Sequence, residues 1–286
     1  MGSTKDRECS KRKKVREDEI LYWYNKGLSN KQISDKTKIT TKNIRYCLHD
    51  YNLKANKDFI EETHEIKQTI LGSILGDGYI TPNTKTRNSR LRFGHCFRQK
   101  EYVIYKSNLL GNLSTKNVRE IAEVDNRFKN PIYTEIRLNT KCHPMLNKYQ
   151  NLSYKKNIKY VNYDLFKDIE ALGVAIWFMD DGSKSASGYH LHTCGFTKKD
   201  LNILRNILKS KFDIHTNIHK PNSLYIPAKS KILFTNLIKN YVCESMKYKL
   251  HLTKEVLNKS DKLLENPEED NQQPTQNLNG FGRFND

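Results

Sequence analysis

The sequence predicts an α+β protein in which one half-domain occurs twice, behind a small helical unit. Three observations lead to this expectation. An internal repeat occurs within residues 66–252, and apolar and polar residues alternate after the second helix of each copy. Apolar residues within 16–53 have helical spacing. Both copies have the order helix, strands, helix, strands, helix, that is, αββαββα. The expected boundaries are a basic flexible arm at 1–15, a helical unit at 16–55, half-domains at 60–157 and 158–263, and a disordered acidic tail at 264–286.

The composition is strongly basic. Fifty Lys and Arg residues stand against 32 Asp and Glu, for a formal net charge of +18. Acids are concentrated in residues 264–286, so the remaining chain is more basic still. Such a surface attracts polyanions and predicts salt-dependent nucleic-acid binding. A merely soluble lysine-rich protein would have a similar composition, so charge alone does not decide the function.

The sequence contains no signal for membrane insertion or export. No apolar run reaches the ~18 residues of a membrane span, and the N-terminus lacks the apolar stretch of a signal peptide. We therefore expect an intracellular protein, in the cytoplasm or nucleoid of a bacterium or phage host, or in a eukaryotic nucleus or organelle. The six cysteines have no zinc-type spacing, which predicts reduced structural thiols.

The helical unit at 16–55 has the pattern of a helix-turn-helix. Its first helix has apolar residues at Ile20, Leu21, Tyr24 and Leu28. Ser29 and Gln32 form a possible capping box for a second helix. A third helix from Thr40 or Thr41 would bury Ile44, Cys47, Leu48 and Tyr51 and expose Lys42, Asn43 and Arg45. The exposed basic and amide side chains predict DNA binding. A three-helix bundle that binds nothing fits the same pattern.

Each half-domain opens with an apolar helix at 66–78 or 172–182. Small residues recur at four-residue spacing, as Gly72 and Gly76 in the first helix and Ala171 and Ala175 in the second. Small residues on one face let two helix backbones approach closely, and helices that are apolar nearly all round are buried. We therefore expect the two helices to pack against each other through these faces.

Both helices end in Asp-Gly, at Asp77-Gly78 and Asp181-Gly182. An acid at a helix C-terminus is unfavourable to the helix dipole, so its occurrence in both copies indicates a function. If the helices pair, the two carboxylates meet, and their repulsion is relieved when a cation binds. Carboxylates with open positions suit Mg²⁺ and the two-metal hydrolysis of phosphodiesters. Asp180 corresponds to Gly76 in the first copy, so we expect no essential role for its side chain.

Lys156 and Lys249 form a second matched pair, each following a tyrosine near the end of its half. A lysine in this position could stabilise the developing charge on a phosphate or position the attacking water. A solvated surface lysine is the alternative, which the repeat disfavours.

The two motifs resemble those of the LAGLIDADG homing endonucleases. They read ILGSILGDG at 70–78 and VAIWFMDDG at 174–182, and the resemblance covers roughly residues 60–255. It implies a monomer whose two αββαββα half-domains form a saddle over double-stranded DNA and cut both strands with Mg²⁺. Two or more Mg²⁺ ions, replaceable by Mn²⁺, would be bound by Asp77, Asp181 and the backbone carbonyls of Gly76 and Asp180. Lys156 and Lys249 would be the basic partners. Ile176 stands where the family commonly has glycine, which predicts looser helix packing there.

DNA recognition is expected on the strands. Arginine and asparagine can pair with the edges of guanine and adenine. The candidates in the first half are Arg87, Asn88, Arg90, Arg92 and His95, and those in the second are Lys184, Tyr189, His190 and His192. Alternation places Arg90 and Arg92 on one face of a strand and Leu91 and Phe93 on the other.

The sequence therefore predicts an endodeoxyribonuclease that hydrolyses phosphodiester bonds in a long asymmetric DNA site, since the two halves differ in sequence. Two other functions remain open. An RNA maturase, a cofactor of intron splicing, has the same fold but needs no acids and would bind RNA. A transcription regulator would use the helix-turn-helix unit alone.

Overall fold

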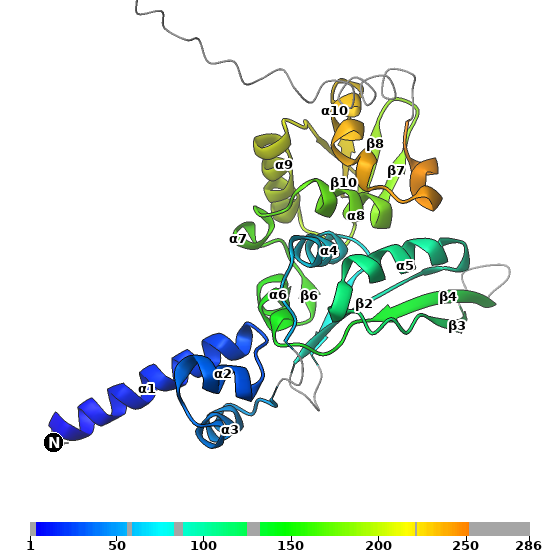
Figure 1. Ribbon diagram of the computed structural model, residues 1–286. Coiled ribbons are helices and arrows are strands. Elements are labelled where there is room, and N and C mark those ends of the chain that lie inside the picture. The colour runs from blue at the N-terminus through cyan, green and yellow to red at the C-terminus, as the bar shows by residue number, and fades with distance from the viewer. Residues whose placement is uncertain (1–3, 56–58, 83–87, 125–131, 221, 252–286) are drawn as a thin grey trace, which may run out of the picture. The chain divides into compact units, whose positions relative to one another are not determined.

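The computed structural model describes residues 4–55, 59–82, 88–124, 132–220 and 222–251 (Figure 1). The chain begins with α1 (Thr4–Asn25), α2 (Asn30–Thr37) and α3 (Thr41–Asp50). Residues 4–15 therefore belong to a helix, although the sequence predicted a flexible arm. The acidic tail at 264–286 lies outside the described residues.

The three N-terminal helices have a hydrophobic cluster of their own. Ser29 caps α2 through the predicted capping box with Gln32, and Thr40 caps α3. The cluster consists of Ile20, Tyr24, Leu28, Ile33, Ile44, Cys47 and Leu48. Tyr51, which was expected to be buried, is 47% exposed. The reason is that α3 ends at Asp50, so Tyr51 leaves the helical stripe.

The first half-domain follows with three helices and two antiparallel hairpins. Its elements are α4 (His64–Leu75), β1 (Tyr79–Pro82), β2 (Ser89–Cys96), α5 (Lys100–Leu109), β3 (Arg119–Val124), β4 (Ile132–Asn139) and α6 (Met145–Ser153). A two-residue hairpin, β5 (Tyr154–Lys155) and β6 (Ile158–Lys159), follows α6.

The second half-domain repeats this order after the short helix α7 (Tyr163–Phe166). Its elements are α8 (Ala171–Asp181), β7 (Gly182–Lys184), β8 (Tyr189–His192), α9 (Lys198–Phe212), β9 (Asn217–His219), β10 (Ser223–Ile226) and α10 (Ala228–Ile238). The chain then forms the 3-10 turns η3 (Lys239–Tyr241) and η4 (Glu244–Lys249).

The two sheets have the same topology, which confirms the predicted fold class. Their strand orders are β1-β2-β4-β3 and β7-β8-β10-β9, and all pairs are antiparallel. In each sheet, alternate residues of the second strand are buried against helices, as Leu91 and Phe93 are in β2 and Leu191 is in β8. Arg90 and Arg92 lie on the other face, as alternation predicted.

The strand register defines which residues of the two halves are equivalent. Tyr79 pairs with Arg92, and Ser183, which likewise follows the Asp-Gly motif, pairs with His190. Arg92 and His190 are therefore equivalent, and the same spacing makes Cys96 equivalent to Cys194. The buried positions of α5 and α9 match at this spacing, which aligns Lys106 with Leu204.

Among the described residues, no helix combines the length and the apolar character needed to cross a bilayer. The cysteines whose side chains are described, at positions 47, 96, 142, 194 and 243, form no disulfide.

Candidate active site

The site lies where α4 and α8 pack side by side (Figure 1). The two helices approach so closely that side chains are excluded at Gly72 in α4 and at Gly76, its C-terminal cap. A Cβ atom on Gly72 would lie 2.4 Å from the Gly173 carbonyl oxygen, and one on Gly76 would lie 2.4 Å from the Asp180 Cβ. The predicted contact through Gly72 and Gly76 is thus confirmed.

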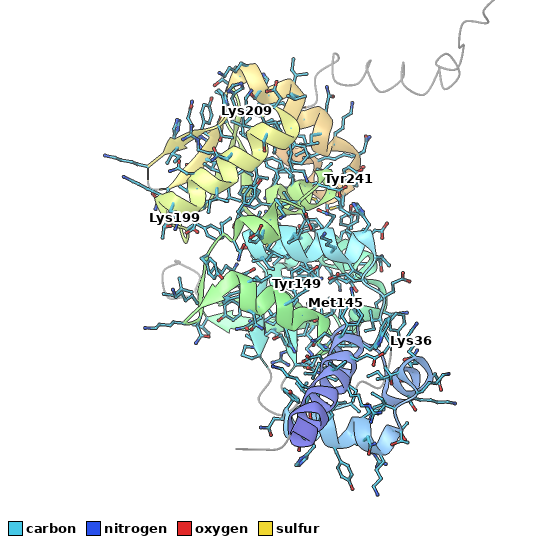
Figure 2. All side chains as sticks on the ribbon, turned by 90° about the vertical axis from the view of Figure 1, so that its left-hand side faces the viewer. Lys36, Met145, Tyr149, Lys199, Lys209 and Tyr241 are labelled. Carbon is cyan, nitrogen blue, oxygen red and sulfur yellow. The ribbon has the colours of Figure 1, made fainter. Side chains whose placement is uncertain are left out.

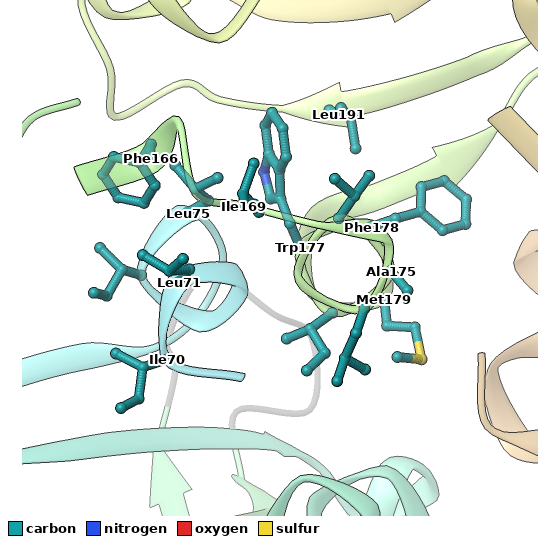
Figure 3. Packing of buried hydrophobic residues seen from close by; sticks show 14 of the residues in the cluster. Ile70, Leu71, Leu75, Phe166, Ile169, Ala175, Trp177, Phe178, Met179 and Leu191 are labelled. Atoms are coloured by element: carbon teal, nitrogen blue, oxygen red, sulfur yellow. The ribbon is translucent and has the colours of Figure 1, made fainter. Parts of the chain in front are cut away.

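The predicted contact face of α8 is wrong. Gly173, Ile176 and Asp180 meet α4, and not Ala171 and Ala175. Ala175 is two residues from Gly173, which is about 200° around a helix. Figure 3 shows Ala175 on the side of α8 turned away from Leu71. Ile176 is fully buried over Gly72, so a large residue on one helix fills the space left by a glycine on the other.

Asp77 lies just beyond the end of α4 and Asp181 is the last residue of α8, so the chain turns differently at the two acids. α4 ends at Leu75, and a hydrogen bond of 2.7 Å from the Gly78 amide to the Ser73 carbonyl closes a tight turn around Asp77. α8 continues through Asp181 itself, and Gly182 donates to Phe178. A Cβ on Gly182 would lie 2.1 Å from the Phe178 ring, so this position also requires glycine.

Both acids have pKa values above the usual range. Burial, followed by the negative charges of Asp77 and Asp180, raises the pKa of Asp181 to about 7. Burial and the charge of Asp180 raise the pKa of Asp77, although 41% of its side chain remains exposed. The effect of the Asp77 charge on Asp181 indicates that these two acids lie close enough to repel, as the sequence suggested.

Two half-buried lysines contact the carbonyl ends of the helix pair. Lys159 Nζ donates to the Gly76 carbonyl at 2.7 Å. Lys249 Nζ donates to the Met179 carbonyl at 2.6 Å and lies 3.4 Å from the Asp180 carbonyl. Burial lowers the pKa of both lysines, and the three nearby aspartates oppose this effect.

Lys249 lies where the sequence placed it, and Lys156 does not. Lys156 is exposed, on the turn between β5 and β6. Lys156 and Asn157 both have positive φ, at 50° and 63°, as in the type I′ turn of a two-residue hairpin. This hairpin reverses the chain and brings Lys159 to the acids instead. Asn157 was the sequence signal for the turn, since asparagine favours positive φ.

Asp180 is the centre of a buried polar cluster, whereas the sequence suggested a bystander. Its side chain is 0% exposed and is paired with Lys106 Nζ at 3.0 and 3.1 Å. Tyr102 donates to it at 2.7 Å. The amide of Asp77 donates to Asp180 Oδ2 at 3.2 Å, so this carboxylate also holds the end of α4.

His95 belongs to the same cluster and not to the DNA-facing side of its strand. Its Nδ1 lies 3.5 Å from Asp77 Oδ2 and its Nε2 lies 3.5 Å from Asp180 Oδ1. Burial and the Lys106 charge lower the pKa of His95 to about 4. Its position could have been inferred, because His95 is in step with the buried Leu91 and Phe93 and out of step with Arg90.

The donors available for a cation are the carboxylates of Asp77 and Asp181. Asp77, His95 and Asp180 place one ligand atom each within 4.8 Å of one another. The Asp180 oxygens, however, already accept hydrogen bonds from Lys106, Tyr102 and the Asp77 amide. Both predicted carbonyl ligands, of Gly76 and Asp180, face lysine ammonium groups.

The open face of the first sheet carries arginine. Arg90 and Arg92 of β2 are joined there by Arg137 of β4 and Arg119 of β3, neither of which was predicted. Asn88 is 4% exposed and its side chain accepts a hydrogen bond from Tyr24, so it is not placed to read DNA. Arg87 lies outside the described residues.

The open face of the second sheet carries an aromatic cluster instead. His190 and His192 of β8 lie beside Tyr225 and His219, which complete a group of neighbouring rings and were not predicted. Lys184 is exposed at the end of β7. Tyr189 was expected on this face but is fully buried, and its hydroxyl contacts Thr235. The helical unit exposes Lys42, Asn43 and Arg45 on α3 as predicted.

Comparisons with known proteins agree with this geometry. The model of the LAGLIDADG DNA endonuclease family matches residues 67–233. Probable intron-encoded endonuclease 1 of Wickerhamomyces canadensis is 30% identical over 215 residues, which are 70% of this chain and 91% of that protein. Cytochrome b mRNA maturase bI2 of Saccharomyces cerevisiae is 30% identical over 217 residues, 70% of this chain but only 51% of the maturase, so the chain spans about half of that relative.

A solved structure has the same fold. The homing endonuclease I-WcaI bound to its DNA recognition sequence matches with a TM-score of 0.62 and 27% identity, over 72% of this chain and 93% of that chain. The family match covers both Asp-Gly helices and both sheets, the elements that build the acidic site. The chain therefore belongs to the LAGLIDADG DNA endonuclease family.

Proposed function

We propose that the chain is a site-specific DNA endonuclease that uses a divalent cation, Mg²⁺ in the cell, to hydrolyse both strands of a long asymmetric site. The observation that carries the proposal is the meeting of Asp77 and Asp181 at adjacent helix ends, with pKa values raised by burial and by neighbouring negative charge. Such a pair costs stability, because the nearby Lys159 and Lys249 do not fully offset the raised pKa values of the two acids. It is an arrangement typical of groups retained for chemistry.

The acidic pair fits a divalent cation. Two hard oxygen donors with excess negative charge suit Mg²⁺, and Mn²⁺ prefers similar ligands. When bound, such an ion would supply charge neutralisation at the phosphate and a more acidic water. The partial exposure of Asp77 and the pocket beside Asp181, lined by Gly76, Lys159 and His192, leave room for a phosphate to approach.

The two lysines have a role independent of the cation. An ammonium group has three donors, and Lys159 uses one of them on the Gly76 carbonyl at 2.7 Å. The remaining donors can reach a phosphate oxygen in the site. Lys249 is placed in the same way at the end of α8. Each lysine therefore offers positive charge to one scissile phosphate as negative charge develops on it.

The open sheet faces would bind the DNA. Arg90 and Arg92 contact one half of the target, and Lys184, His190 and His192 contact the other. Because the two faces differ, the target is asymmetric, and because both acids occur in one chain, a monomer suffices. The exposed Lys42, Asn43 and Arg45 of α3 provide a further grip on flanking DNA.

Cleavage can be tested before the target sequence is identified. Fragmented host DNA and an intron-less copy of the gene's own locus are incubated with the purified chain and Mg²⁺, and new ends are sequenced. We expect a single major site with a double-strand break, absent in Asp77→Asn and Asp181→Asn. Asp164→Asn, an exposed acid paired with Lys167, is the matched control and should cut normally. The proposal fails if no site is cut, or if the Asp77 and Asp181 variants cut as well as the parent.

A second candidate function is RNA binding in intron splicing. Two relatives are named cytochrome b mRNA maturase bI2, and that from Saccharomyces cerevisiae is 30% identical. The outer face of α9 is basic, with Lys199 and Lys209 exposed near its two ends (Figure 2). Splicing of the host intron by Asp77→Asn, which removes cleavage, would demonstrate this function. Splicing at the same rate with and without the protein would exclude this function.

A further inference from the structure

We propose that Asp180, Lys106, Tyr102 and His95 form a positioning network that orients Asp77 and leaves the carboxylate of Asp181 unrestrained. The two halves of the active site are then unequal, and the two DNA strands are cut at different rates. The inference rests on the proposed endonuclease function and adds that the two acids of that site are supported unequally.

The network is a buried ion pair with hydrogen bonds on every side. Lys106 and Asp180 are both 0% exposed, and their charged atoms lie 3.0 Å apart. Tyr102 donates to the same carboxylate oxygen at 2.7 Å. Lys106 comes from α5 of the first half and Asp180 from α8 of the second, so the pair joins the two halves. A buried charge left without its partner is strongly unfavourable, so the two residues depend on each other.

The network reaches Asp77 at two points. The Asp77 amide donates to Asp180 Oδ2 at 3.2 Å, which fixes the backbone beyond the end of α4. His95 Nδ1 lies 3.5 Å from Asp77 Oδ2, which limits the orientation of the carboxylate. The His95 ring is itself held between Asp180 and the Tyr102 ring, whose centroid is 4.9 Å away. Backbone and side chain of Asp77 are therefore both restrained.

Asp181 has no equivalent support. Within the described part of the chain, its carboxylate makes no hydrogen bond or ion pair. The residues equivalent to the network confirm the difference: Gly76 for Asp180, Leu204 for Lys106, Thr193 for His95 and Asp200 for Tyr102. Asp200 is engaged elsewhere, capping α9 and accepting from the Val161 amide at 2.8 Å. One half thus has a charged pair where the other has leucine and glycine.

This difference has a consequence for catalysis. A preorganised carboxylate loses little freedom when it engages its cation and phosphate, whereas an unrestrained one must first be ordered. The Asp77 carboxylate is preorganised by protein groups, whereas the Asp181 carboxylate becomes ordered only when a cation or a DNA phosphate binds. Removal of the network should therefore slow the strand served by Asp77 much more than the other strand.

Two variants carry the residues of the opposite half. His95→Thr removes the orienting ring, and Lys106→Leu combined with Asp180→Gly replaces the ion pair without leaving a lone charge. Leu204→Met, at the position equivalent to Lys106, is the control for a general disturbance of the core. DNA labelled differently on each strand is cut under single-turnover conditions, and the ratio of the two rate constants is measured. We expect both variants to slow the same strand, the one served by Asp77, at least about fivefold relative to the other strand. Leu204→Met should leave the ratio unchanged.

A second readout uses the protein without cation or DNA. Amide hydrogen exchange at Asp77 should be at least about tenfold faster in the Lys106→Leu, Asp180→Gly variant, because its acceptor is gone, while exchange at Asp181 stays the same. Equal slowing of both strands, or unchanged exchange at Asp77, would overturn the inference while the endonuclease function stands. A parent chain that cuts no DNA would overturn the proposed function and the strand inequality together.

Discussion

The two half-domains have the same topology but differ in where they place charge. The first half exposes arginines on its sheet and buries Lys106 beneath the site, whereas the second exposes histidines and buries Leu204. Both halves nevertheless end their first helix in Asp-Gly and supply one lysine to the helix ends. Glycines and apolar residues therefore maintain the backbone topology and helix packing that both halves share, whereas the polar residues at equivalent positions differ. Structural equivalence of the halves does not imply that they act equally.

The largest effect within the comparison of the two halves, apart from loss of the acids themselves, concerns the lysine that each half supplies. Lys159→Met and Lys249→Met should each lower the cleavage rate by about 10²-fold, since each removes a charge beside the developing phosphate charge. Lys156→Met, the exposed lysine predicted from sequence, is the matched control and should cut at the parental rate. Rates are measured with saturating protein. A loss confined to Lys156→Met would show that the turn residue, and not Lys159, serves the site.

The next effect tests the close packing of α4 against α8. Gly76→Ala places a Cβ 2.4 Å from the Asp180 Cβ, so the helices must separate, at a cost of about 1–3 kcal/mol in stability. Gly195→Ala meets no atom within 4 Å and should change stability by less than about 0.5 kcal/mol. Thermal unfolding of the two variants measures the difference. Equal melting temperatures would contradict the close contact of α4 and α8.

A smaller effect concerns pH. The pKa of Asp181 is raised from 3.8 to about 7, so its ionised form is penalised in the folded state. The protonated form contributes stability fully below pH 4, and this contribution is lost as the pH rises through 7. Without divalent cations, the melting temperature of the parent should fall by a few degrees more between pH 5 and 8 than that of Asp181→Asn. Added Mg²⁺ should reverse the fall at pH 8. Parallel pH profiles for the two proteins would contradict the raised pKa.

The smallest effect distinguishes the two sheets. If Arg92 contacts a DNA phosphate, Arg92→Ala should reduce the slope of log K against log salt by about 0.9. His192→Ala should weaken binding with a smaller change in slope, because it removes a ring contact and a hydrogen-bonding group and not the permanent positive charge of an arginine. Fluorescence anisotropy in Ca²⁺ at several salt concentrations provides both values. Equal slope changes would show that the two faces bind phosphate alike.

Much of this organisation could be predicted because it leaves local patterns. The repeat, the Asp-Gly ends and the alternation around Arg90 and Arg92 each involve neighbouring residues or fixed spacings. His95 follows the same alternation, and its burial was predictable in principle. The family resemblance added the αββαββα order, which the two sheets confirm.

The remaining features depend on contacts that no local pattern records. Lys106 and Asp180 are separated by 74 residues, and only the packing of α5 on α8 brings them together. Lys159 was missed because the chain reverses at the two-residue turn of Lys156 and Asn157. The lysine that reaches the acids is therefore the one in β6, after the turn. The contact face of α8 was misjudged because Ala175 and Gly173 are both small, and their rotation relative to α4 decides which one is used.

The central claim is that Asp77 and Asp181 form one shared site that cuts both strands. Once the target is known, single-turnover cleavage with Mg²⁺ is followed on each strand for the parent, Asp77→Asn and Asp181→Asn. We expect loss of double-strand breaks by at least about 10³-fold in each variant, with DNA binding in Ca²⁺ unchanged within about threefold. Double-strand cleavage by either variant at a rate near that of the parent would contradict the claim.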